Sequence, residues 1–389
     1  METKLLLIRY GELGLKGKNK IKFINILVHN IKAALADLPR RRIEATWGRV
    51  WVEVRDDMPQ VLERLSRVFG IYSISPVIEC GRDLEAIQAA ALQVLQNALP
   101  AGGSFKVESR RADKSFPLPS PELSKAVASY LFEQVDARYR ADMHQPERTV
   151  SIEVRNEGVF VYGEVLPGAK GLPVGASGKA MLLLSGGIDS PVAGWMAMKR
   201  GVSIEAIHFH SFPFTGEKSR EKVIDLCRLL AKWHGKPVQL HVVHFTDIQM
   251  AIRANCPEEY GITIMRRMMF RIAALLASQR NALALYSGEC VGQVASQTLE
   301  SMDTINSVID IPVLRPLVGL DKEEIIAYAQ RIGSFETSIL PYEDCCTLFL
   351  PAFPKIRPKR AEAMEMEQAL DIEGLIEQAL AKTEKIVIK

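Results

Sequence analysis

The feature that most constrains this chain is an apolar run that turns sharply into a helix. Residues 181–184 read Met-Leu-Leu-Leu, which is typical of a buried parallel strand. The chain then turns through Ser185, Gly186 and Gly187, and Pro191 suits the first turn of a helix, where its missing N–H costs nothing. Glycines let a backbone approach a ligand closely, and the N–H groups of such a turn and helix start form a nest for an anion. The pattern predicts a strand–turn–helix unit with an anion site.

Asp189 and Ser190 refine this prediction. A serine hydroxyl adds a donor, but a carboxylate is an unfavourable neighbour for phosphate unless Mg²⁺ lies between them. The combination predicts a site for the pyrophosphate of ATP, with Mg²⁺. A Walker loop is excluded because its G-x-x-x-x-G-K-[ST] pattern and its lysine are missing. The S-G-G-x-D-S motif resembles the loop of the PP-loop ATP pyrophosphatases, which activate a carbonyl oxygen as its adenylate. The alternative, a tight turn without a ligand, leaves an aspartate inside an anion nest unexplained.

Length and composition bound the rest of the chain. Its 389 residues predict two or three domains, and a hydrophobic content of 48% is that of a globular protein. The apolar runs are far shorter than a membrane span, the N-terminus has no secretory pattern, and the six cysteines have no metal-site spacing. We therefore expect a cytoplasmic protein with no membrane partner and no protein-bound metal centre. With a net charge of only +3, nucleic-acid binding would have to come from local basic patches.

The first half of the chain reads as two small α/β units. The first has the order β-α-β-β-α-β, which indicates a ferredoxin-like unit, and the second begins with a helix and ends in a hairpin. Predicted strands of the first unit are 4–9, 43–47, 50–54 and 73–79, and its helices are 20–38 and 58–68. In the second unit we predict helices at 84–99 and from Ser120, the expected N-cap, and strands at 105–109, 149–154 and 159–164. A Gly/Pro-rich connector at 167–178 marks the clearest domain boundary.

From residue 179 onward, strand and helix patterns alternate, which indicates a doubly wound parallel sheet. The predicted strands are 180–184, 203–208, 238–243 and 282–286, and the predicted helices are 191–200, 217–234 and 263–279. Residues 361–389 have the pattern of one or two charged helices. Ligands of such sheets gather at the carboxyl ends of the strands, and the anion nest follows the first strand as this rule requires.

Further candidate residues follow the other strands. Ile-His-Phe-His at 207–210 ends the second strand, where the histidines are either metal ligands or, more in keeping with a stacking Phe209, neighbours of a nucleotide. Gly288 and Gln297 follow a later strand, where glycine allows close ligand approach and glutamine can recognise a base edge. Arg266 and the arginine after it begin a helix, where they either neutralise phosphate or form a solvated face.

A second chemical centre is predicted at Cys345 and Cys346. They lie in the polar, turn-like sequence Pro-Tyr-Glu-Asp-Cys-Cys-Thr, whereas Cys227 lies in an apolar helical period and should be inert. Reactive thiols need nearby cations or helix ends, and basic residues lie just downstream of the pair. An iron–sulfur cluster is not expected, because adjacent cysteines cannot replace a C-x-x-C with a third ligand.

Basic clusters in the first 120 residues are the third signal. Each alone could be a solvated face, but together, on a chain with a nucleotide-activating domain, they favour contact with RNA phosphates. The candidate RNA-binding residues are Lys16, Lys18, Arg110, Arg111, Lys114, Phe116 and Lys125.

At this point the residues resemble a known family. Four segments are together similar to the tRNA 4-thiouridine synthetases, also called tRNA uracil 4-sulfurtransferases. They are Ile-Arg-Tyr-Gly-Glu-Leu-Gly-Leu-Lys-Gly-Lys-Asn at 8–19, the motif at 185–193, the segment 288–299 and Asp-Cys-Cys at 344–346. The resemblance covers essentially the whole chain. It implies a ferredoxin-like domain at 1–60 with its closing strand reaching about 80, a THUMP RNA-binding domain at 61–166, and a PP-loop domain at 179–389.

The resemblance also implies a reaction. ATP adenylates O4 of the uridine at position eight of tRNA and releases pyrophosphate, and a persulfide loaded by a cysteine desulfurase then delivers sulfur to C4 as AMP leaves. By motif position, the resemblance implies that the serines and glycines of the loop contact ATP. The other implied ATP contacts are Leu183, Leu184, His208, Phe209, Arg266, Gly288 and Gln297. Asp189 serves the activation step, Cys346 is the reactive cysteine and Cys345 the second candidate. Residues 116–125 lie in the region expected to meet the acceptor end of tRNA.

Some family members carry a C-terminal rhodanese domain with the persulfide cysteine, and this chain is expected to lack it. Sulfur is then expected to reach Cys345 or Cys346 directly or through a separate carrier, and sulfur supply for the thiamine thiazole and a homodimer remain open alternatives. The rival functions are another PP-loop ATP-dependent ligase and a non-catalytic RNA-binding protein.

Overall fold

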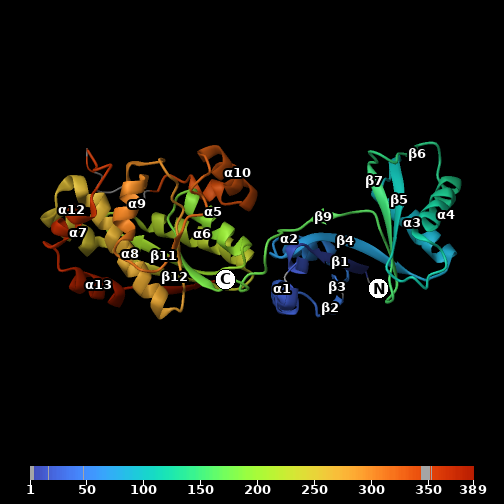
Figure 1. Cartoon of the computed structure of the whole chain (residues 1–389), viewed down its shortest axis with the longest axis horizontal. Coiled ribbons are helices and arrows are strands. Elements are labelled where there is room, and N and C mark those ends of the chain that lie inside the picture. Colours follow the sequence, from blue (N-terminus) through green and yellow to red (C-terminus); the bar gives the residue numbers. More distant parts are fainter. Residues whose placement is uncertain (1–3, 16, 47, 343–350, 352) are drawn as a thin grey trace. The chain divides into compact units, whose positions relative to one another are not determined.

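The computed structural model describes residues 4–15, 17–46, 48–342, 351 and 353–389, and the chain forms two compact units, Met1–Gly171 and Leu172–Lys389. Figure 1 shows each unit as strands covered by helices. Among the described residues, no helix is long and apolar enough to cross a membrane.

The first part of unit 1 is the predicted ferredoxin-like fold. Its elements are β1 (Lys4–Tyr10), α1 (Lys20–Ala34), β2 (Ile43–Thr46), β3 (Arg49–Val54), α2 (Met58–Ser66) and β4 (Ile71–Cys80), with short 3-10 turns before α1. The strand order is β2-β3-β1-β4, and neighbouring strands are antiparallel. Leu27 and Ile31, four residues apart on one face of α1, are fully buried, as the helical period requires.

The second part of unit 1 continues the same sheet through β4. Its elements are α3 (Leu84–Ala98), β5 (Gly103–Arg111), α4 (Ser120–Gln134), β6 (Tyr139–Ala141), β7 (Arg148–Val154), β8 (Val159–Tyr162) and β9 (Leu166–Pro167). Residues 71–77 of β4 pair with β1 and residues 78–80 pair with β8, so one long strand serves both parts (Figure 1). The predicted β7–β8 hairpin is confirmed. Ser120 is the first helical residue of α4 rather than its N-cap, which is Pro119, and no side chain caps the helix there.

Unit 2 is the doubly wound sheet. The strand order is β14-β13-β10-β11-β12-β15, made of β10 (Lys179–Leu183), β11 (Ser203–His210), β12 (Val238–His244), β13 (Leu285–Tyr286), β14 (Val313–Leu314) and β15 (Glu384–Ile388). Strands β10 to β14 are parallel. The chain passes from β10 to β11 on one side and returns later to β13 on the other, so a topological switch point lies beside β10.

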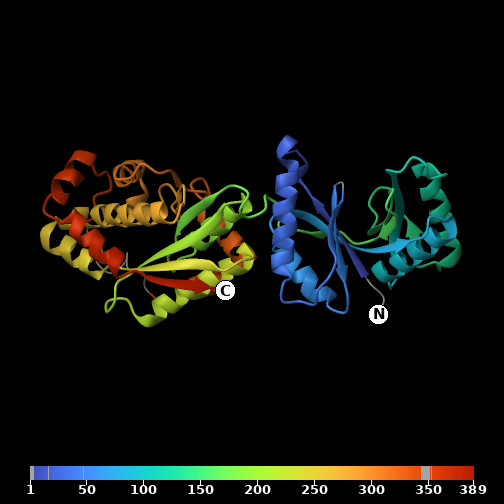
Figure 2. The same ribbon diagram turned by 90° about the horizontal axis from the view of Figure 1, so that it is seen from below.

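Two groups of helices cover this sheet. One group consists of α5 (Asp189–Lys199), α6 (Glu217–His234), α10 (Lys322–Ile332) and α11 (Phe335–Ser338), which contact one another. The other is gathered around α8 (Gly261–Gln279) and includes α7 (Thr246–Asn255), α9 (Leu299–Asn306), α12 (Arg360–Glu367) and α13 (Ile372–Ala381). Figure 2 shows the two groups on either side of the strands.

The C-terminal segment corrects the sequence prediction. One or two helices were expected to complete the chain, but it ends in β15, which adds to β12 as an antiparallel edge strand. The short β-branched run Ile386–Ile388 is the local signal for this strand, and the charged residues around it obscure the pattern. The sheet is therefore mixed rather than wholly parallel.

Gly194 decides how closely α5 packs on β10. A Cβ at this position would lie 2.6 Å from Leu182 Cδ2 and 3.3 Å from Leu230 Cδ1, so an added side chain would force these buried leucines or the helix to shift. We expect Gly194→Ala to lower the free energy of unfolding by about 1–3 kcal/mol, the usual cost of overpacking a core. Gly261→Ala, at the first position of α8 with no atom within 4 Å of the added Cβ, is the matched control.

The control should be neutral or stabilise the protein by up to about 1 kcal/mol, because alanine loses less backbone entropy than glycine. Urea unfolding of both variants provides the measurement. Equal stabilities for the two variants would contradict the packing of α5 described above.

Candidate nucleotide site

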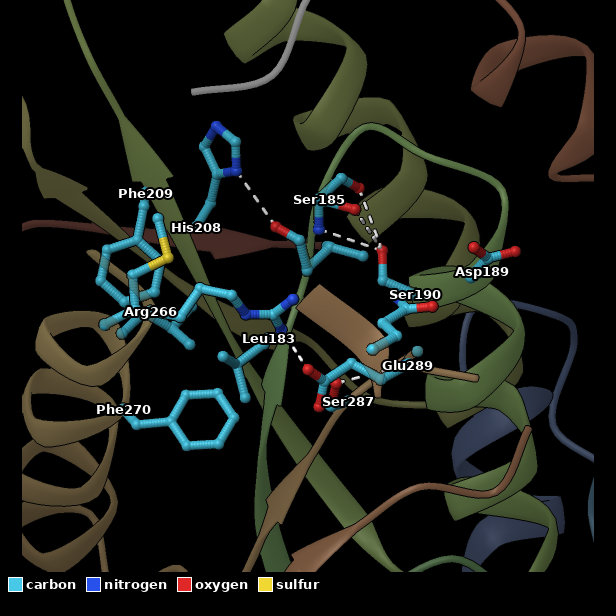
Figure 3. A pocket seen from close by; sticks show the side chains of 15 residues that line it. Leu183, Ser185, Asp189, Ser190, His208, Phe209, Arg266, Phe270, Ser287 and Glu289 are labelled. Carbon is cyan, nitrogen blue, oxygen red and sulfur yellow. Dashed lines mark hydrogen bonds and ion pairs between the residues drawn. The ribbon is translucent and has the colours of Figure 1, made fainter. Parts of the chain in front are cut away.

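A pocket of about 250 Å³ opens at the carboxyl ends of β10, β11 and β13, beside the switch point (Figure 3). Its walls come from the turn after β10, the end of β11, one face of α8 and the segment after β13. The lining residues are Leu183, Leu184, Ser185, Asp189, Ser190, Ile207, His208, Phe209, Arg266, Met269, Phe270, Ser287, Gly288, Glu289 and Gln297. The structure thus brings together most of the residues that the sequence selected from four separate segments. Gly186 and Gly187 form the turn itself and are not among the lining residues.

The turn after β10 is held by its two serines. The Ser190 hydroxyl accepts a hydrogen bond from the Ser185 N–H at 3.0 Å and lies 3.1 Å from the Ser185 hydroxyl, and the Gly187 N–H donates to Ser185 Oγ at 3.3 Å. Helix α5 begins at Asp189, and its N-cap, Ile188, has no side chain that can accept a hydrogen bond. The start of α5 is therefore not capped by its own N-cap residue, as expected at a helix start that faces an anion.

Gly288 lines the pocket and also has a role that the sequence did not reveal. A Cβ there would lie 2.7 Å from the carbonyl carbon of Asp189 and from the nitrogen of Ser190. The absence of a side chain therefore lets the segment after β13 press against the first turn of α5. The prediction that glycine allows close approach of a ligand stays untested, and the structure adds that two backbones approach closely here.

Asp189 forms contacts that the sequence did not reveal. Its Oδ1 accepts a bond from Lys322 Nζ at 2.7 Å, and its Oδ2 lies 3.4 Å from Gln293 Nε2. Lys322 is the first residue of α10, which Asp321 caps in a capping box with Glu324. The capping pattern in the sequence identifies the helix start, but no local signal connects it with a loop more than 130 residues away. The loop at 185–190 contains no lysine of its own, and Lys322 of α10 brings a positive charge to it.

The two arginines at the start of α8 have different partners. Arg266 faces the pocket and pairs with Glu289, which also accepts a bond from Arg315 Nε at 2.7 Å (Figure 3). Arg267 is 2% exposed and binds both oxygens of Glu367 at 2.8 Å, which ties α12 to α8. Adjacent helical residues point about 100° apart, so the pair could not serve one ligand together. The sequence missed Glu289 because its charge partners are distant in the chain.

Glu289 is a buried carboxylate between two guanidinium groups. Burial alone would raise its pKa, but the charges of Arg266 and Arg315 outweigh this effect and hold the pKa below its usual value. Glu289 is therefore ionised at neutral pH. It orients Arg266 at the pocket wall, and a second nitrogen of Arg266 donates to Ser296 Oγ at 3.3 Å.

The remaining walls are mostly apolar. Figure 3 shows Leu183, Phe209 and Phe270 around the pocket, with the His208 ring bonded to the carbonyl of Leu184 at 3.0 Å. This bond fixes the ring of His208 against β10. Within the described part of the chain, no group of three or more His, Cys, Asp or Glu side chains could hold a metal ion. The arrangement of an apolar slot beside an anion nest and an arginine suits a nucleotide.

The cysteines divide into two sets. Cys345 and Cys346 lie outside the described residues, so their prediction stays untested. Cys227 is fully buried in α6, and burial raises the pKa of its thiol to about 12. A thiol with such a pKa is a poor nucleophile at neutral pH, in agreement with the expectation that Cys227 is inert.

The basic candidates of unit 1 also divide. Lys18, Arg110, Lys114 and Lys125 are exposed, while Lys16 lies outside the described residues. The burial of Phe116 corrects its prediction, whereas the half-buried Arg111 stays an untested candidate. Phe116 is 4% exposed and packs in the core of the second part of unit 1, and Arg111 donates to the carbonyl of Phe116 at 2.8 Å. The aromatic ring next to the basic cluster is therefore not at the surface.

Comparisons with known proteins identify the family. Residues 175–372 match the family model of the thiamine biosynthesis protein ThiI, residues 5–75 match its ferredoxin-like domain, and residues 81–164 match the THUMP domain. A probable tRNA sulfurtransferase of Moorella thermoacetica is 52% identical over 99% of this chain and 97% of its own length. One from Brevibacillus brevis is also 52% identical, over 99% and 96%.

The chain belongs to the tRNA sulfurtransferase family. A crystal structure of a 4-thiouridine synthetase in complex with RNA and ATP matches it over 100% of both chains, with a TM-score of 0.93 and 38% identity. The family resemblance and the three-part fold predicted from the sequence are confirmed. The chain is thus an enzyme of the sulfurtransferase class, and the non-catalytic alternative is not favoured.

The pairing of Glu289 with two arginines yields a stability prediction. Glu289→Ala leaves both guanidinium groups without their carboxylate, and the loss of one partner of a buried pair costs about 3–5 kcal/mol. The control is Glu300→Ala, whose carboxylate is 51% exposed and lies 3.5 Å from the exposed Arg357, and it should cost at most about 1 kcal/mol. Urea unfolding at neutral pH measures both.

The cost of Glu289→Ala should depend on pH. Because the folded pKa of Glu289 is lowered, its contribution is present above its unfolded value of 4.5 and is lost as the pH falls through the folded pKa. The gap between wild type and Glu289→Ala should therefore shrink below about pH 4.5. A gap that stays constant down to the lowest pH at which the protein folds would show that the ion pairs do not stabilise the site.

Proposed function

We propose that this enzyme uses ATP to transfer sulfur to C4 of the uridine at position eight of tRNA, giving 4-thiouridine. The observation that carries the proposal is the pocket at the switch point, where the start of α5, two serine hydroxyls and Arg266 face an apolar slot. Family membership, together with the ATP and RNA bound by the similar 4-thiouridine synthetase, supports the choice of nucleotide and substrate.

In this proposal ATP lies across the pocket from α8 to the turn after β10. The apolar walls enclose the adenosine, and the nest at Ser185–Ser190 holds the phosphates, with Arg266 as a cationic partner. The proposed ATP contacts are Leu183, Leu184, Ser185, Gly186, Gly187, Ser190, His208, Phe209, Arg266, Gly288 and Gln297.

Asp189 is the proposed activating residue, acting on the phosphates through Mg²⁺. Its carboxylate lines the pocket and is 24% exposed, and carboxylates together with phosphate oxygens and water are the ligands that Mg²⁺ prefers. Lys322, bonded to the same carboxylate, is the proposed cation that neutralises charge developing on the leaving pyrophosphate.

The activation step solves a chemical problem. The carbonyl oxygen at C4 of uracil is a poor leaving group, but as its adenylate it leaves as AMP. A thiolate or persulfide is a strong nucleophile at neutral pH, and Cys346, with Cys345 as the second candidate, is the proposed carrier. We propose a cysteine desulfurase as the sulfur donor and the reducing cytoplasm as the compartment, where such thiols stay available.

Unit 1 is the proposed tRNA-binding part. The exposed cations Lys18, Arg110, Lys114 and Lys125 supply phosphate contacts, and Lys16 belongs to the same proposal. We propose the division of the chain into 1–60, 61–166, a linker at 167–178 and the PP-loop domain at 179–389. The long β4, which pairs with both parts of unit 1, supports a single RNA-binding body built from the first two.

The test of the proposed function is an assay with the full chain, ATP, Mg²⁺, sulfide and unmodified tRNA transcript. We expect tRNA-dependent release of pyrophosphate and the absorbance of 4-thiouridine. Asp189→Ala should lower the rate at least about 10²-fold, the effect of removing one preorganised electrostatic group. The control is Asp310→Ala, since Asp310 is an exposed aspartate in the same unit and does not line the pocket. An active Asp189→Ala variant would remove this residue from the mechanism, and wild type without 4-thiouridine would refute the function.

A second prediction separates the cysteines. With sulfur from a cysteine desulfurase, Cys346→Ser should lose thiolation, whereas Cys227→Ser should keep it because that thiol is buried with a pKa of about 12. Cys345→Ser, assayed in parallel, tests the second candidate. Full activity of Cys346→Ser with both desulfurase and free sulfide would contradict the assignment and point to Cys345 or to a separate carrier.

A further inference from the structure

Arg315 lies behind the wall of the nucleotide pocket. It follows β14 directly, its side chain is 11% exposed, and it is not among the described residues that line the pocket. Its Nε donates to Glu289 Oε2 at 2.7 Å, and its Nη2 donates at 2.8 Å to Oδ1 of Asn306, the last residue of α9. One nitrogen of this guanidinium is therefore committed to Glu289 and another to a different helix.

Glu289 divides its two carboxylate oxygens between two arginines. Arg266 Nη2 donates to Oε1 (Figure 3), and Arg315 Nε donates to Oε2. The Glu289 side chain is only 4% exposed, so an oxygen that lost its arginine would remain buried without a partner, which is costly. The guanidinium of Arg266 is already in place at the other oxygen, and a guanidinium readily binds both oxygens of one carboxylate. Loss of Arg315 would therefore draw Arg266 onto both oxygens.

The next residue of α8 shows what such a two-oxygen contact looks like. Arg267 donates to both oxygens of Glu367 at 2.8 Å through Nε and Nη2, and it is only 2% exposed. Its guanidinium is used to hold two helices together. Arg266 instead bonds one oxygen of Glu289, donates with Nη1 to Ser296 Oγ at 3.3 Å and lines the pocket. The two neighbouring arginines thus differ in how far a glutamate engages them.

The charges of the three groups also favour an anion. The pKa of Glu289 lies below its usual value, because the charges of Arg266 and Arg315 outweigh its burial, so the carboxylate is ionised at neutral pH. Two guanidinium groups and one carboxylate leave one net positive charge at the pocket wall. Arg266 and Glu289 alone would form a neutral pair. A unit charge matters here because its surroundings are largely buried and screen it weakly.

We propose that Arg315 is a positioning residue of the ATP site, which occupies Oε2 of Glu289 and thereby keeps the Arg266 guanidinium available to the phosphates. The inference rests on the proposed function and adds a residue that acts on the nucleotide without lining its pocket. Without Arg315, Arg266 closes onto Glu289, gives up its bond to Ser296 and loses the net positive charge beside it. ATP then binds more weakly, while the chemistry of bound ATP is unchanged.

The experiment measures the Kd for ATP by isothermal titration calorimetry with the full chain and Mg²⁺. Arg315→Gln should raise this Kd about 10-fold, within the range of couplings between residues of one ion-pair network. Arg315→Lys keeps the charge but lacks the fork that reaches both Glu289 and Asn306, so its Kd should rise only about threefold. In the thiolation assay, the KM for ATP should rise with the Kd while kcat changes less than about twofold, as expected when only ground-state binding is lost.

The matched control is Arg271→Gln. Arg271 also shares a buried glutamate with a second arginine, because it donates to both oxygens of Glu367 at 2.8 Å beside Arg267. It is absent from the pocket lining that the described residues form. Arg271→Gln should therefore lower the free energy of unfolding, as removal of one partner of a buried pair does, and leave the Kd for ATP unchanged. An equal rise of the Kd in Arg271→Gln and Arg315→Gln would show a general disturbance and overturn the proposal.

A double-mutant cycle tests whether Arg315 acts through Glu289. With Glu289→Gln in place, residue 289 has no charge with which to engage Arg266, so adding Arg315→Gln should change the Kd less than about twofold. The same effect of Arg315→Gln in both backgrounds would show that it acts on ATP directly, which would overturn the positioning role. If Arg315→Gln alone does not fold, Arg315→Lys takes its place in the same cycle.

ATP binding by the wild type separates this inference from the proposed function. If the wild type binds ATP and both Arg315 variants bind it with the wild-type Kd, the positioning role is wrong and the proposed function stands. If the wild type binds ATP but makes no 4-thiouridine, the proposed function is refuted, and the Kd values still decide the role of Arg315. A wild type that does not bind ATP would overturn both.

Discussion

The close approach of Gly288 to the first turn of α5 is the constraint on which the site depends. With no Cβ at residue 288, the backbone after β13 lies against Asp189 and Ser190, beside the switch point of the sheet. Glycine at 194 has the matching role on the other side, because it lets α5 lie directly on β10. The first turn of α5 is thereby held against the segment that follows β13, while the middle of the helix lies close to the Leu182 side chain of β10. An anion site made of backbone N–H groups needs this rigidity, because its strength comes from donors that are already in place.

Ion pairs between residues far apart in the sequence hold the charged side chains around the start of α5. Glu289 holds Arg266 at the pocket wall and takes a second arginine, Arg315, from beyond β14. Lys322 reaches Asp189 from the start of α10. A pocket for a polyanion needs cations that stay in place before the ligand arrives, and carboxylate partners satisfy this need. The same pairs leave the lysine and the arginine close to where phosphate charge is proposed to develop.

The sequence predicted what local patterns encode, and it failed where distant contacts decide. Periodicity located α6 to the residue and β10 within one residue, because each buries a regular face. The loop motif identified the site because its spacing is local. Lys322 and Glu289 were missed since their partners lie far away in the chain, and Phe116 was misjudged because its burial depends on the packing of α3 and α4. The final strand β15 was missed since an edge strand is short and half exposed, so its pattern resembles that of a charged tail.

The central claim is that the pocket activates O4 of the target uridine as its adenylate. The most direct measurement uses tRNA whose uridine at position eight carries ¹⁸O at C4, with the full chain, ATP, Mg²⁺ and sulfide, followed by mass spectrometry of the products. Adenylation transfers the uracil oxygen to the nucleotide, so the account predicts that the AMP formed with each 4-thiouridine contains one ¹⁸O. Unlabelled AMP, with the isotope released into water, would contradict the account.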